Sequence, residues 1–193
     1  MNEQPHWMQV LVMSLGELAF VIPGIPLYML LVLPNHPAGA LPGLVPAIDV
    51  DADPALAVAA AAGAVVLGLA VVYALFRLGG LERFMVDEIR ILVDEFSVLD
   101  FIPIYIAAGI GEEFLFRVAL VEPLGIVVPA LLFAAIHIAY WRKPLILVYV
   151  FVFGLLMGAL YLYTESFLLC AAAHALYNFL LSCFMKWGII PID

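Results

Sequence analysis

The chain has 193 residues, of which 67% are hydrophobic and only 12% are charged, and its mean hydropathy is +1.18. An ordinary soluble domain is about half apolar and about a quarter charged, so this composition excludes that class and indicates an integral membrane protein. The net charge of −9, from 16 acidic and 7 basic residues, argues against nucleic acid as a partner.

Long apolar segments alternate with short polar connections along the chain, and each apolar segment is long enough to cross a bilayer. They predict one all-α domain, residues 1–193, a polytopic bundle of about six transmembrane helices, at residues 7–33, 55–76, 100–121, 124–141, 145–163 and 167–184. Apart from one arginine inside the third segment, basic residues follow only the second, fourth and sixth segments. The positive-inside rule therefore predicts that both termini are cytoplasmic.

The first segment contains residues that disturb a simple apolar helix. Pro23 and Pro26 are expected to kink or interrupt it, because proline removes a helical hydrogen bond. Glu17 also lies in this segment, and we interpret it as protonated or hydrogen-bonded to a neighbouring helix rather than catalytic. The proline-rich stretch 34–54 is predicted to be an irregular polar loop. In the fifth segment, a Gly-x-x-x-Gly spacing at Gly154 and Gly158 predicts close helix packing.

Residues 81–96 have a different pattern, with apolar residues at three- and four-residue intervals and charged residues on the other side. This pattern predicts an amphipathic helix along the membrane surface or over the mouth of the bundle. Glu88 falls near the apolar side and weakens the pattern. Because this helix directly precedes the third segment, it could gate a cavity there, a hypothesis that rests on adjacency alone.

Three charged residues lie close together inside the third apolar segment, which Asp100 is expected to cap. Charges at membrane depth are costly, so they normally have partners or a function. Glu113 and Arg117 are four positions apart with the acid first, the favourable orientation for an ion pair within one helix. Glu112 has no such partner, so it must face something supplied by another segment.

Polar residues in later segments provide candidates. His137 lies in the fourth segment, and His174 and Asn178 lie one turn apart in the sixth. Glu112 could act as a general base that removes a proton from water, with His137 helping to hold that water. His174 and Asn178 could donate hydrogen bonds to the oxyanion that forms when this water attacks a carbonyl.

At these residues the chain resembles the CPBP intramembrane proteases, the CAAX protease and bacteriocin-processing group that includes the type II CAAX prenyl endopeptidases. The motifs are Glu-Glu-x-x-x-Arg from Glu112, Phe-x-x-x-His from Phe133 to His137, and His-x-x-x-Asn from His174 to Asn178, within residues 99–184. The resemblance implies an intramembrane glutamate protease, a hydrolase that cuts a membrane-associated peptide or protein in contact with lipid. It assigns catalysis to those four polar residues, Glu112, His137, His174 and Asn178, and a structural role to Glu113 and Arg117. We expect no metal and no cofactor, because the His-Glu-x-x-His spacing is absent and Asn178 suits an oxyanion donor better than a zinc site.

Two other functions are compatible with the same residues. Glu112, His137 and His174 could bind Zn²⁺ and leave one position open, which would make the protein a zinc-dependent protease. A non-proteolytic immunity or scaffold protein, or a small transporter, would also explain polar groups inside a membrane. The sequence does not identify the substrate, whether that substrate is prenylated, or the oligomeric state.

Overall fold

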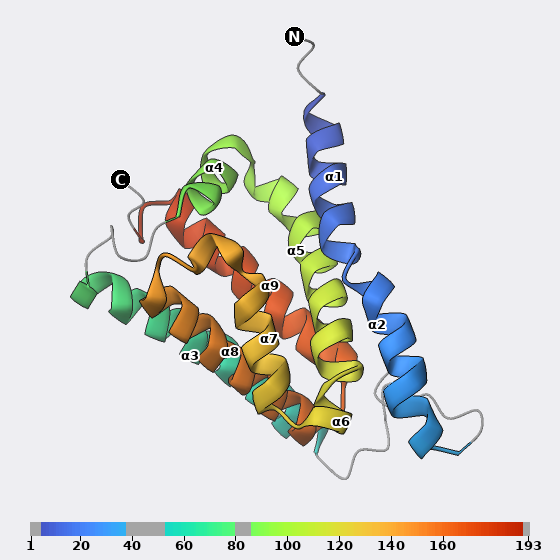
Figure 1. The fold of residues 1–193 in the computed structure, drawn as a ribbon. Coiled ribbons are helices and arrows are strands. Elements are labelled where there is room, and N and C mark those ends of the chain that lie inside the picture. Colours follow the sequence, from blue (N-terminus) through green and yellow to red (C-terminus); the bar gives the residue numbers. More distant parts are fainter. Residues whose placement is uncertain (1–4, 38–52, 80–85, 191–193) are drawn as a thin grey trace.

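The computed structural model describes residues 5–37, 53–79 and 86–190. All regular secondary structure in these ranges is helical, which confirms the predicted all-α membrane bundle (Figure 1). Within the described ranges, four helical stretches are long and apolar enough to cross a membrane: His6–Asn35, Pro54–Leu78, Pro144–Thr164 and Phe167–Lys186. They correspond to the predicted first, second, fifth and sixth spans. Most of the predicted loop 34–54 and the first residues of the predicted amphipathic helix lie outside the described residues.

The first span is interrupted, as its prolines predicted. Helix α1 (His6–Leu18) ends and α2 (Val21–Leu27) begins after a two-residue break, and the axis bends there (Figure 1). The break includes Ala19, which lies four residues before Pro23. In a regular helix the Ala19 carbonyl would accept from the backbone N–H at position 23, but proline has no N–H and its ring clashes with that carbonyl. The remainder of the span continues through a π-helical turn, Tyr28–Val32.

The third predicted span is α5 (Val98–Glu113), which continues into a π-helical turn, η4 (Phe114–Val118). Its N-cap is Ser97, not Asp100. The Ser97 side chain accepts from the Asp100 backbone N–H, and the Asp100 carboxylate accepts from the Ser97 N–H, a reciprocal capping box. The prediction of Asp100 as the cap was wrong by three positions, because both residues are needed to satisfy the free N–H groups of the first turn.

The fourth predicted span, 124–141, requires a correction. The structure divides it into the end of α6 (Val121–Leu124), α7 (Val127–Ile136) and a 3₁₀ turn, Ile138–Tyr140. The ten residues of α7 make a helix about 15 Å long, half of what a bilayer core requires. Apolar composition alone could not reveal that the helix stops at His137.

Helix α5 lies inside the bundle, between α1 on one side and α9 (Phe167–Lys186) on the other. A Cβ added at Gly111 would collide with the backbone carbonyl oxygen of Glu17 on α1, and one at Gly109 with that of Ala171 on α9. The absence of side chains at these two positions lets three helix backbones approach closely. The charged motif is therefore carried by the most enclosed helix of the fold.

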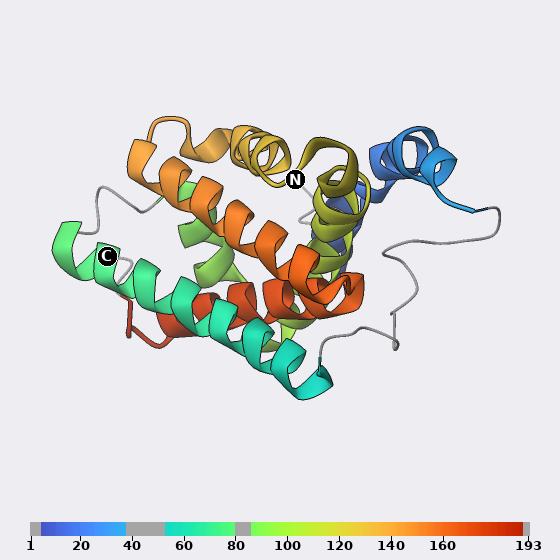
Figure 2. The same cartoon turned by 90° about the horizontal axis from the view of Figure 1, so that it is seen from below.

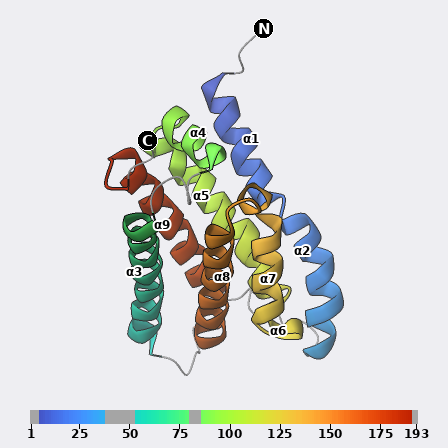
Figure 3. The ribbon, with the colours of Figure 1, turned by 60° about the vertical axis from the view of Figure 1, so that its left-hand side comes forward.

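The remaining long helices form the other side of the bundle. Helices α3 (Pro54–Gly79) and α8 (Pro144–Thr164) run side by side, and both contact α9 (Figures 2 and 3). Helix α7 packs on α8 through the two predicted glycines. A Cβ at Gly154 would lie 3.2 Å from the Cα of Ala130, and one at Gly158 would lie 3.1 Å from the Cβ of Ile126. The packing prediction for this Gly-x-x-x-Gly pair is confirmed.

The described part of the predicted amphipathic helix is α4 (Asp87–Glu95), at the end of the bundle where α1 begins and α9 ends (Figure 1). Its apolar residue Val93 is buried, and so is Phe96, the residue that directly follows the helix. Lys186 at the end of α9 donates hydrogen bonds to the carbonyls of these two residues, at 2.6 and 2.7 Å. The C-terminal end of α4 is therefore anchored to α9.

Candidate active site

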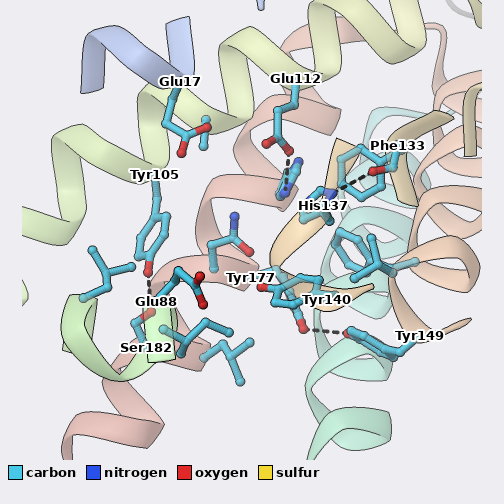
Figure 4. A pocket seen from close by; sticks show the side chains of 18 of the residues that line it. Glu17, Glu88, Tyr105, Glu112, Phe133, His137, Tyr140, Tyr149, Tyr177 and Ser182 are labelled. Atoms are coloured by element: carbon cyan, nitrogen blue, oxygen red, sulfur yellow. Dashed lines mark hydrogen bonds and ion pairs between the residues drawn. The ribbon is translucent and has the colours of Figure 1, made fainter. Parts of the chain in front are cut away.

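A cavity of about 350 Å³ lies among the helices, and the four predicted catalytic residues all line it. Glu112 lies on α5, His137 is the C-cap residue of α7, and His174 and Asn178 lie on α9. Figure 4 shows the side chains of Glu112 and His137 turned toward the same space. The fold thus brings together polar residues that are separated by 66 positions in the sequence, from 112 to 178.

Glu113 and Arg117 form the predicted ion pair, with Arg117 Nε 2.9 Å from Glu113 Oε2 and both side chains fully buried. Arg117 also lies over the Phe133 ring, 5.3 Å from its centroid. Glu113 has a second contact that the sequence did not predict, since its Oε1 accepts a 2.8 Å hydrogen bond from His174 Nδ1. One buried carboxylate therefore holds both the arginine of its own helix and the histidine of α9.

His174 faces both acids of the motif. Because the carboxylate can only accept, Nδ1 of His174 carries the hydrogen that bonds Glu113. The opposite ring nitrogen, Nε2, lies 3.6 Å from Glu112 Oε2. Glu112 is 7% exposed and His174 is 3% exposed, so the two groups meet in a water-poor environment. The partner that Glu112 lacks in its own helix is supplied by α9.

His137 is held by Phe133, the other residue of its motif. The Nδ1–H of His137 donates to the Phe133 carbonyl oxygen at 2.6 Å, and the two rings lie 4.7 Å apart. Tyr140 also stacks on the imidazole, with centroids 5.5 Å apart and an interplanar angle of 18°. Because Nδ1 is the donor, neutral His137 presents the lone pair of Nε2 as an acceptor.

Several residues that the sequence did not assign to the site also line the cavity. Glu17 and Glu88 reach it from α1 and α4 (Figure 4), and Tyr105 does so while hydrogen-bonded to Ser182. The sequence contained a signal for both acids: Glu17 interrupts an apolar segment, and Glu88 departs from the amphipathic pattern. Glu17 was interpreted as protonated or hydrogen-bonded to a neighbouring helix rather than catalytic, and no residue near it in the sequence indicates that it lines this cavity.

Among the side chains that the structure describes, no three His, Cys, Asp or Glu residues are close enough together to hold a metal ion. Both candidate histidines use Nδ1 for hydrogen bonds, to a backbone carbonyl and to Glu113, so each presents only Nε2 to the cavity.

The fold and the cavity define a helical membrane protein with a polar, histidine- and carboxylate-lined site enclosed by its helices. Residues 94–180 match the family model described as type II CAAX prenyl endopeptidase Rce1-like. This segment contains all three motifs, and over these residues the match confirms the predicted resemblance to the CAAX-type endopeptidases. Neither the comparison with curated proteins nor the comparison with solved structures gave a match.

Proposed function

We propose that this protein hydrolyses a peptide bond of a membrane-associated peptide or protein with a water molecule activated by Glu112 and His137. The observation that carries the proposal is that Glu112, His137, His174 and Asn178 line one enclosed cavity. The family match supports endopeptidase activity in general terms, and the roles of individual residues below are our own assignment.

The hydrogen-bonding state of each histidine supports these roles. His137 presents a lone pair on Nε2, so it can accept one hydrogen of a water while the Glu112 carboxylate accepts the other. We assign His174 as the doubly protonated ring, which donates from Nδ1 to the Glu113 carboxylate. Its Nε2–H then faces the cavity as a donor, beside the Asn178 amide one helical turn away.

The reaction that we propose proceeds in two steps. In the first, Glu112 takes a proton from water as the water oxygen bonds to the scissile carbonyl carbon, and the carbonyl oxygen becomes an oxyanion that accepts from His174 and Asn178. In the second, the oxyanion re-forms the carbonyl, the C–N bond breaks, and Glu112 gives its proton to the leaving nitrogen. The products are a carboxylic acid and an amine, the acid proton passes to the amine to leave a carboxylate and an ammonium group, and Glu112 is again ionised. Burial strengthens these electrostatic interactions relative to water.

A decisive test compares the parent protein with Glu112→Gln, which keeps the shape of the side chain and removes the base. Both proteins are reconstituted in lipid vesicles and assayed on fluorogenic membrane peptides. We expect the substitution to lower kcat about 10²- to 10⁴-fold, the range for loss of a general base. Glu165→Gln is the matched control, because Glu165 is exposed between α8 and α9 and does not line the cavity. Equal rates for the parent and Glu112→Gln would refute the proposed mechanism.

The zinc-dependent alternative makes a different prediction in the same assay. Chelator treatment would abolish cleavage and added Zn²⁺ would restore it, whereas the mechanism proposed here predicts that chelation has no effect. Asn178→Ala also distinguishes the two mechanisms. If Asn178 is an oxyanion donor, the substitution lowers kcat about 10²- to 10³-fold, whereas in a zinc-dependent mechanism this amide has no such role.

A further inference from the structure

A second cavity of about 490 Å³ forms a groove between α1 and α4. Its walls are mainly apolar, with Met8, Val12 and Met13 on the side of α1 and Ile91, Leu92 and Phe96 on the side of α4. We call this cavity the α1–α4 groove. Its size and its apolar lining suit several consecutive apolar side chains, or one long hydrocarbon chain.

The α1–α4 groove adjoins the candidate active site. Met13, Glu88 and Leu92 line both the groove and the cavity that contains Glu112. An extended peptide advances about 3.3 Å per residue, so a few residues would run from the groove to the catalytic groups. A substrate bound at the catalytic groups would therefore also place neighbouring residues in the groove.

Charge distinguishes the kinds of chain that could occupy this path. Glu17 and Glu88 enter the active-site cavity from α1 and α4 (Figure 4), and Glu95 lies on the wall of the groove. No lysine or arginine is present among the described residues that line either cavity. Carboxylates in such a partly enclosed site attract a basic side chain and repel an acidic one. A hydrocarbon chain would fill the apolar walls but has no group to pair with these acids.

We propose that the substrate is an apolar peptide segment with a basic residue beside the scissile bond. Its apolar residues occupy the α1–α4 groove, and its lysine or arginine lies between Glu17 and Glu88. This inference rests on the proposed function and adds to it the chemical class of the substrate. Glu17 and Glu88 are then residues that determine specificity, whereas Glu112 performs the chemistry.

The test uses three membrane peptides that differ only in one residue beside the scissile bond: lysine, its neutral counterpart glutamine, or glutamate. The parent protein in vesicles of zwitterionic lipid is expected to cleave the lysine peptide with a kcat/KM at least about 10-fold above the glutamine peptide, and the glutamate peptide most slowly. Glu88→Gln and Glu17→Gln should each reduce the preference for lysine. Glu88→Lys should shift it toward glutamate. Asp94→Asn is the control, because Asp94 lies exposed on α4 and lines neither cavity.

The outcomes are distinguishable from failure of the proposed function. Equal cleavage of all three peptides, with the rate still dependent on Glu112, would overturn the substrate assignment and leave the protease intact. Cleavage that rises when an isoprenoid or acyl chain is attached, with no effect of side-chain charge, would assign the groove to lipid and also overturn it. Cleavage that survives Glu112→Gln, or absence of cleavage of every peptide, would overturn both. The peptide series on the parent protein does not depend on whether any variant folds.

Discussion

Replacing Glu113 by glutamine should destabilise the protein strongly, although the side chain keeps its shape. Glu113 and Arg117 are both fully buried with nitrogen and oxygen 2.9 Å apart, so the substitution leaves a buried guanidinium without a counter-charge. Removing one partner of a buried pair costs about 3–5 kcal/mol in the free energy of unfolding. That loss corresponds to a more than about hundredfold change in the folding equilibrium. It is measured by SDS titration of the purified protein in mixed micelles.

A double variant separates this stability effect from the effect on the site. Glu113→Leu with Arg117→Met replaces the whole pair by apolar groups of similar volume, a change that is often neutral or stabilising. The double variant should still lose about 1–3 kcal/mol in the free energy of unfolding relative to the parent, because the Nδ1–H of His174 is left without its acceptor. The double variant should therefore be more stable than Glu113→Gln. Cleavage should nevertheless stay at least about 10-fold below the parent, because His174 has lost the carboxylate that orients it.

Two results would refute this account of Glu113. One is a free energy of unfolding for Glu113→Gln within about 1 kcal/mol of the parent, which would mean that the buried pair is not what Arg117 depends on. The other is parental cleavage by the double variant, because His174 would then need no orienting acceptor.

Three further predictions concern the helices that enclose the site. Gly111→Ala should lower the free energy of unfolding by about 1–3 kcal/mol, because the new Cβ collides with the backbone of α1. The control Gly63→Ala, whose new Cβ meets nothing within 4 Å, should be neutral or slightly stabilising. Equal effects of the two substitutions would contradict the close contact of α1 and α5. Tyr105→Phe should cost about 1 kcal/mol, and a double-mutant cycle with Ser182→Ala should reveal coupling between the two hydroxyls. Lys186→Met should speed hydrogen exchange in α4 without changing exchange in α5, because it removes the two bonds that anchor the end of α4.

The sequence predicted which polar residues would share a cavity better than it predicted the elements that carry them. Spacing alone identified the pair of Glu113 and Arg117, because the geometry of one helix determines which side chains at i and i+4 meet. The motif that contains His137 was found, yet the helix around it was predicted to be a full span. The sequence remains apolar beyond His137, so hydropathy alone does not show that α7 ends there.

By itself, the sequence determined the features that depend on composition and on local periodicity. These are the class of helical membrane protein, the proline break in the first span, and the ion pair of Glu113 and Arg117 within the third span. Only the tertiary structure decided which side chains share a cavity. Glu17, Glu88 and Glu112 belong to three different helices, and His174 reaches Glu113 across 61 positions. Such contacts follow from how closely helix backbones approach, here through glycines on α5, and no pattern within a single helix encodes which neighbour it will meet.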